Sequence, residues 1–155
     1  MNRTVLRLLA LAMPLALAGC DDGVSPRALR IDEVAGSYIA TRPPGGALSL
    51  GALTFTIVQN GVERDLLAEG SEIDLLLRAD GTTTGHVLVT GADDEGDFEA
   101  DLTGTWSLDG NVVTLDHEAD TFLRDMPLTV RVDQLEGEET FAGVRVRVVL
   151  EQPEL

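Results

Sequence analysis

Phe98-Glu-Ala-Asp-Leu-Thr-Gly-Thr-Trp-Ser-Leu108 decides the fold of this chain, because apolar and polar side chains alternate along it without a break. Leu102 and Trp106 lie on one face, and the charged and hydroxyl side chains between them lie on the other. Successive side chains of a β-strand point to opposite faces, so the pattern predicts a strand with one buried and one solvated side. Asp109-Gly110 follows, a dipeptide that suits the positive φ angles of a hairpin turn.

Alternating segments and tight turns recur from Val34 to the end of the chain, with almost no helical periodicity. Asn60-Gly61 and Asp80-Gly81 predict two further hairpins. Phe141 falls out of phase with the valines that follow it, which predicts a bulge near Ala142-Gly143 after a turn at residues 136–139. The predicted strands are residues 36–42, 53–59, 62–68, 72–78, 82–90, 98–108, 112–115 and 128–133, and a last one through Val144, Val146 and Val148.

The order of these segments predicts an all-β fold. Consecutive hairpins form a meander, and a meander of eight or nine strands with one solvated face removes its edges by closing into an antiparallel up-and-down β-barrel. A two-sheet β-sandwich is the alternative. Residues 117–127 are the least regular and predict a loop with at most one helical turn.

The N-terminal residues have the pattern of an export signal. Arg3 and Arg7 precede an uncharged run, and Leu17-Ala18-Gly19-Cys20 places small residues directly before the only cysteine. This resembles a bacterial lipoprotein signal, in which cleavage before Cys20 leaves an N-terminal cysteine that carries acyl chains such as palmitate. We therefore expect a signal peptide at 1–19, a lipidated cysteine and flexible tether at 20–33, and one barrel domain at 34–155.

This resemblance implies a lipoprotein of the bacterial cell envelope that faces the periplasm and is held to a membrane by its N-terminal lipid. Asp21 resembles the signal for retention in the inner membrane, but the choice between inner and outer membrane stays open.

Composition narrows the classes of partner. Without residues 1–19 the chain has nine arginines, no lysine and 27 carboxylates, a formal balance of −18. Such an acidic surface repels nucleic acid, so we expect no nucleic-acid partner. Lipidation of Cys20 would leave no thiol for a disulfide or for catalysis.

Three motifs resemble those of the bacterial lipocalin-like domains: Gly36-Ser37-Tyr38, the stretch Leu77-Arg78-Ala79-Asp80-Gly81-Thr82, and Gly104-Thr105-Trp106 running into Gly110-Asn111. The resemblance covers roughly residues 34–116 and implies a small barrel, often lipid-anchored, without specifying a ligand. Tyr38 stands where lipocalins usually have tryptophan. In that family an arginine of a late strand packs over this aromatic residue. Arg145 or Arg147 could supply it here, but their alternation with valines indicates instead that both face outward, so the role stays open.

Motifs for catalysis and for metal binding are incomplete. Residues 47–51 have the outline of a nucleophile elbow but lack its strand–turn–helix context. His117-Glu118-Ala119-Asp120 has no second histidine at helical spacing, and His86 is the only other one. We therefore expect no enzyme and no cofactor, and we interpret His117 as a solvated loop residue.

A dense acidic run offers oxygen ligands for calcium at Asp93, Asp94, Glu95 and Asp97, but without EF-hand spacing. A plain acidic hairpin loop is the favoured interpretation.

The apolar face of the barrel is the remaining candidate site. An eight-stranded barrel either fills itself with side chains or holds one small ligand, and the sequence leaves both open. We expect binding of a small apolar or amphipathic ligand, and the alternative is a structural or interaction module that docks an unidentified envelope partner through the acidic surface. The candidate lining residues are Phe55, Ile57, Leu75, Leu77, Val87, Val89, Phe98, Leu102 and Trp106.

Overall fold

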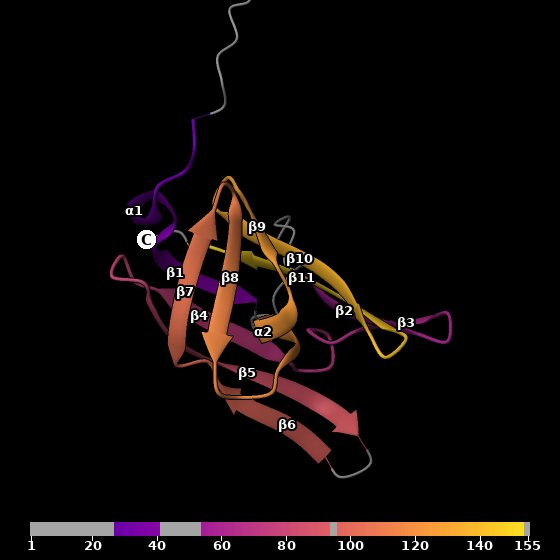
Figure 1. Cartoon of the computed structure of the whole chain (residues 1–155). Coiled ribbons are helices and arrows are strands. Elements are labelled where there is room, and N and C mark those ends of the chain that lie inside the picture. Colours follow the sequence, from indigo (N-terminus) through magenta and orange to yellow (C-terminus); the bar gives the residue numbers. More distant parts are fainter. Residues whose placement is uncertain (1–26, 41–53, 94–95, 154–155) are drawn as a thin grey trace, which may run out of the picture.

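The computed structural model describes residues 27–40, 54–93 and 96–153, and antiparallel strands dominate this part (Figure 1). No helix within these ranges is long and apolar enough to cross a membrane. The helices are α1 (Ile31–Val34) and α2 (Phe122–Asp125). The strands are β1 (Gly36–Ala40), β2 (Thr54–Gln59), β3 (Val62–Asp65), β4 (Glu72–Leu77), β5 (Thr82–Asp93), β6 (Gly96–Asp101), β7 (Gly104–Asp109), β8 (Val112–His117), β9 (Leu128–Arg131), β10 (Gln134–Phe141) and β11 (Val144–Glu151).

Eight of the strands close into an antiparallel barrel, as the meander pattern predicted. Their order around the wall is β1, β4, β5, β7, β8, β9, β10 and β11, and Ile39 of β1 pairs with Glu151 of β11 to complete the ring. The two-sheet sandwich is not formed. Closure gives every wall strand a neighbour on both sides.

The two ends of the barrel differ. At one end α1 leads into β1, where Gly36 pairs with Leu77. At the other end β8 stops at His117, and α2 carries the chain to β9, which begins at Leu128. We call this second end the mouth.

Three strands lie outside the ring, which the meander pattern did not predict. β2 pairs with β11, β3 pairs with β2, and β6 pairs with β5. The predicted turn at Asn60-Gly61 is confirmed, since both residues have positive φ. However, its hairpin lies on the outside of β11 instead of standing in the wall.

The segment 98–108 forms two strands rather than the single one predicted. β6 runs beside the distal part of β5, where Phe98 is opposite Val89. The chain then shifts into the wall, because β7 pairs with β5 only through Gly104 and Thr105. Leu102 lies between the two strands and donates its N–H to the Gly85 carbonyl at 2.9 Å. The alternation of faces survives this shift, which is why the sequence does not reveal it.

The turn predicted at residues 136–139 is wrong. Those residues lie inside β10, and the chain turns at Ala142 and Gly143, where φ is +48° and +86°. The expected bulge is therefore a two-residue hairpin turn that pairs Phe141 with Val144. Gly137 lies inside β10 and lets Leu128 pack closely against the backbone, because a Cβ there would lie 2.7 Å from Leu128 Cδ2.

Trp106 anchors the buried interior at the end opposite the mouth. Its side chain is 5% exposed, and its indole N–H donates to the Arg78 carbonyl at 2.8 Å. Tyr38 is buried as well and donates to the Val34 carbonyl at 2.7 Å. Arg145 and Arg147 are exposed, so their predicted outward orientation is confirmed.

Candidate ligand-binding site

An apolar pocket of about 110 Å³ lies at the mouth. Its walls come from elements outside the ring or beyond its end: the β2–β3 hairpin, the distal part of β5, and α2. The wall strands of the ring contribute three lining residues: Val89 and Ala92 from the distal part of β5, and Val146 from β11. The lining residues are Phe55, Ile57, Arg64, Leu66, Val89, Ala92, Phe122 and Val146.

Two aromatic rings connect α2 to the outer hairpin. The rings of Phe55 and Phe122 have centroids 5.3 Å apart and planes tilted by 34°. Such offset aromatic pairs stabilise beyond their buried area by about 0.5–1.5 kcal/mol. The contact holds α2 against β2 and forms one side of the pocket.

A change in the β5 backbone directs the distal wall inward. Val89 faces the pocket, and the register between Val89 and Asp93 shifts against β6. Gly91 has φ +60° within this shift, a conformation that L side chains rarely adopt. Since the irregularity reverses the alternation, Ala92 reaches the same face as Val89.

Arg64 is the charged residue of the pocket lining. It pairs directly with Ile57 across the β2–β3 hairpin, so its side chain lies on the apolar face. Its guanidinium donates from Nε to one oxygen of Glu69 at 3.2 Å and from Nη2 to the other. This pairing with Glu69 raises the pKa of Arg64 further, so the group stays cationic.

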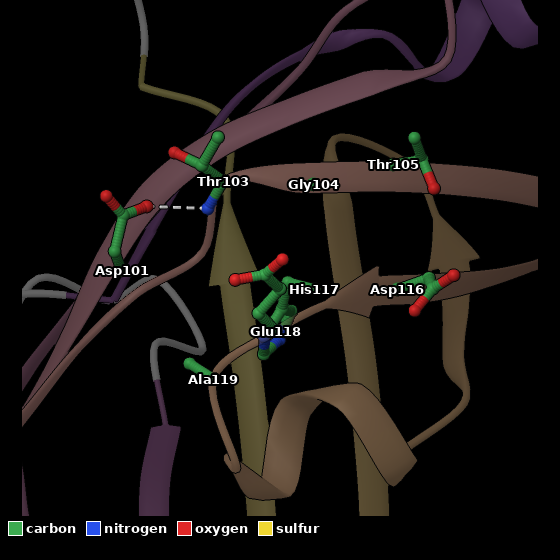
Figure 2. Close-up of a pocket in the computed structure, with 8 residues that line it drawn as sticks. All are labelled: Asp101, Thr103, Gly104, Thr105, Asp116, His117, Glu118 and Ala119. Atoms are coloured by element: carbon green, nitrogen blue, oxygen red, sulfur yellow. Dashed lines mark hydrogen bonds between the residues drawn. The ribbon is translucent and has the colours of Figure 1, made fainter.

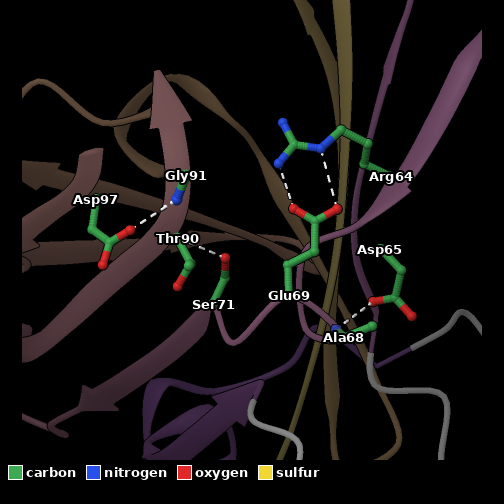
Figure 3. A network of polar contacts seen from close by, with 8 residues as sticks. All are labelled: Arg64, Asp65, Ala68, Glu69, Ser71, Thr90, Gly91 and Asp97. Atoms are coloured by element: carbon green, nitrogen blue, oxygen red, sulfur yellow. Dashed lines mark hydrogen bonds and ion pairs between the residues drawn. The ribbon is translucent and has the colours of Figure 1, made fainter. Parts of the chain in front are cut away.

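Polar contacts fix the backbone around the pocket rim (Figure 3). Asp97 accepts the Gly91 N–H, and Ser71 accepts the Thr90 N–H, both at 2.9 Å. Asp65 accepts the Ala68 N–H at 3.1 Å and shapes the turn that carries Glu69. The rim is therefore held in place by the protein itself.

The structure brings together three of the nine predicted lining residues, Phe55, Ile57 and Val89. Phe98 is 37% exposed and does not line the barrel interior, because it belongs to β6, which pairs with β5 outside the ring. The other five belong to the packed core instead of a cavity: Leu75, Leu77, Val87, Leu102 and Trp106.

Five lining residues were missed by the sequence analysis. The position of Arg64 could have been predicted from the sequence. A two-residue turn at Asn60-Gly61 fixes the register of the hairpin and places residue 64 opposite Ile57. Phe122 lies in the segment without periodicity, and Ala92 depends on the irregularity near Gly91, so the pattern gave no signal for either. Leu66 and Val146 have apolar neighbours in sequence that do not distinguish pocket from core.

A second hollow lies on the outer face of β7 and β8 (Figure 2). This groove of about 650 Å³ is lined by exposed carboxylates of Asp101, Asp116 and Glu118. Thr103 donates hydrogen bonds to Asp101, which lowers the pKa of that carboxyl group. The groove is a polar, negatively charged surface.

His117 was expected to be solvated, and this is wrong. It ends β8 on the inward face with 5% exposure, and its Nε2 lies 3.3 Å from Thr121 Oγ1, just before α2. Burial lowers the pKa of His117, and the positive charge of Arg124 acts in the same direction.

The structure describes only part of the calcium candidate. Asp97 holds the rim through Gly91. Asp94, Glu95 and the side chain of Asp93 lie outside the described residues, as do Cys20 and residues 47–51. Within the described ranges, no three His, Cys, Asp or Glu side chains cluster as metal ligands.

Comparison of the chain with models of known protein families, with curated proteins and with solved structures gives no significant match. The fold and the site therefore define its class: an eight-stranded antiparallel barrel with an apolar pocket at one end.

Proposed function

We propose that the protein is a lipid-anchored, non-catalytic lipoprotein of the cell envelope, with a lipocalin-like barrel that binds a small apolar or amphipathic ligand at its mouth. The apolar pocket formed by Phe55, Phe122 and their neighbours carries this proposal. The signal that ends in Cys20 supports the location, and the closed barrel together with the Gly104-Thr105-Trp106 motif supports the lipocalin-like class.

The size of the pocket limits what enters it. Its volume of about 110 Å³ is smaller than the roughly 150 Å³ of an engineered protein cavity that holds benzene. The pocket thus fits the end of an alkyl chain or a small branched group. Burial of about four methylenes at ~0.8 kcal/mol each contributes roughly 3 kcal/mol, so the rest of the ligand must interact at the rim.

Photo-crosslinking tests this proposal with the lipidated full-length protein in phospholipid nanodiscs. The probe is a neutral long-chain alcohol with a diazirine at the chain end, and mass spectrometry maps the adducts. We expect adducts on peptides that contain Ala92 or Phe122, because both residues line the pocket.

Ala92→Phe should fill the pocket and reduce these adducts at least tenfold. Ala68→Phe is the matched control, because Ala68 is also an exposed alanine near the rim but does not line the pocket. Equal labelling of both variants and of the wild type, or adducts scattered over the surface, would refute the proposal.

The acidic groove favours a second candidate, an interaction module for a basic envelope partner. Its carboxylates would attract a lysine- or arginine-rich surface. A photo-crosslinking amino acid at Thr105 in living cells should then capture one discrete protein, and Asp116→Asn combined with Glu118→Gln should abolish the capture. A cross-link that survives these substitutions would contradict charge-based docking.

A further inference from the structure

Arg64 is a cationic residue in the otherwise apolar lining of the pocket. Its stem stands beside Ile57, and its Nη2 lies 3.9 Å from the position that a Cβ at Gly91 would occupy. The guanidinium therefore extends from β3 toward β5 over the rim of the pocket, and its side chain remains 40% exposed (Figure 3). A ligand that enters the pocket passes this cation.

Glu69 shows which chemistry the cation accepts. Both of its carboxylate oxygens receive hydrogen bonds from Arg64, one from Nε and one from Nη2. These bonds use two of the five N–H groups of the guanidinium. The other three donate to no acceptor among the described residues and are left for a ligand. A planar carboxylate matches the fork of donors, whether it joins at the free edge or displaces Glu69.

We propose that the pocket selects alkyl carboxylates: the chain end lies against the contacting rings of Phe55 and Phe122, and the carboxylate accepts hydrogen bonds from Arg64. This assignment rests on the proposed function and specifies its ligand. Glu69 then acts as an internal competitor that occupies the cation when no ligand is bound.

The overall charge sharpens the expectation. With a formal charge of −18 after removal of residues 1–19, the protein repels anions in general, so an anionic ligand needs a local cation to compensate. A cationic ligand would instead require Glu69. Neutralising Glu69 therefore has opposite effects on the two classes, which makes the sign of this effect diagnostic.

Competition against the neutral diazirine alcohol tests the assignment in the same nanodiscs. We expect octanoate to displace the probe at a concentration at least tenfold lower than octan-1-ol. Arg64→Gln should raise the octanoate concentration to that of octan-1-ol and leave octan-1-ol unchanged. Glu69→Gln should lower the octanoate concentration several-fold.

Arg145→Gln is the matched control, because Arg145 precedes the pocket residue Val146 on β11 but points outward. Circular dichroism checks that every variant keeps its strand content. Equal competition by octanoate and octan-1-ol in the wild type, or a preference that persists in Arg64→Gln, overturns the carboxylate assignment and leaves apolar binding intact. A probe that never labels the pocket overturns the proposed function itself.

Discussion

Replacing Trp106 by alanine should be among the most damaging substitutions in the barrel wall. The side chain is 95% buried and its N–H is bonded to the Arg78 carbonyl, so truncation removes apolar contacts and leaves that carbonyl without its donor. Phe and Trp truncations in cores cost about 3–5 kcal/mol. At ~2.1 cal/mol/K per residue, the domain of residues 34–155 has an unfolding entropy of roughly 0.26 kcal/mol/K. A loss of about 4 kcal/mol therefore lowers Tm by about 15 °C.

Thermal melts followed by far-UV circular dichroism measure this loss, since Trp106 is the only tryptophan and its fluorescence disappears with it. Thr105→Ala is the control on the exposed face of the same strand and should cost well under about 1 kcal/mol. Trp106→Phe keeps most of the apolar volume and should fall between the two. Equal losses at positions 105 and 106 would refute the assignment of one buried and one solvated face.

Three further outcomes are expected. Cys20→Ser should release the protein from membranes or leave it uncleaved, which fractionation measures; a cleaved variant that still sediments with membranes would contradict the lipoprotein interpretation. Gly104→Ala should prevent folding at 37 °C, because its Cβ would lie 2.9 Å from His117 Cβ and still closer to the Asp116 carbonyl, and soluble, folded material would contradict the register there. Burial lowers the pKa of His117 in the folded state below its unfolded value of about 6.5. The stability contributed by the neutral imidazole is therefore fully present above pH ~6.5 and is lost as the pH falls from there toward the folded pKa. Urea midpoints at pH 8 and pH 5 should differ more for the wild type than for His117→Gln, and identical differences would exclude His117 as the source.

The sequence predicted the parts of the fold that depend on local chemistry. The turn at Asn60-Gly61 lies where its dipeptide places it, because both residues adopt positive φ, whereas the turn predicted at Asp109-Gly110 lies one residue later, at Gly110-Asn111, and only Gly110 has positive φ. The alternation around Trp106 correctly separated buried from exposed positions. Both signals involve neighbours within a few residues.

The parts that failed depend on which strands meet. Alternation assigns Phe98 a face, but its exposure is decided by the position of β6 outside the wall. Likewise β11 is long enough to pair with β2 along one part and with β1 at its end, and no local pattern distinguishes a wall strand from an outer one. The pocket could not be predicted for the same reason, because the outer strands β2 and β3 supply three of its eight lining residues, Phe55, Ile57 and Arg64.

The two strands that end the sheet system, β3 and β6, each present one side without a strand partner in the described chain. Open edges of this kind invite strand addition between molecules. Charged side chains occupy alternate positions on both strands, Glu63 and Asp65 on β3 and Asp97, Glu99 and Asp101 on β6. Copies that approach edge to edge bring like charges together, so the acidity that the composition shows also keeps neighbouring molecules from joining into a continuous intermolecular sheet.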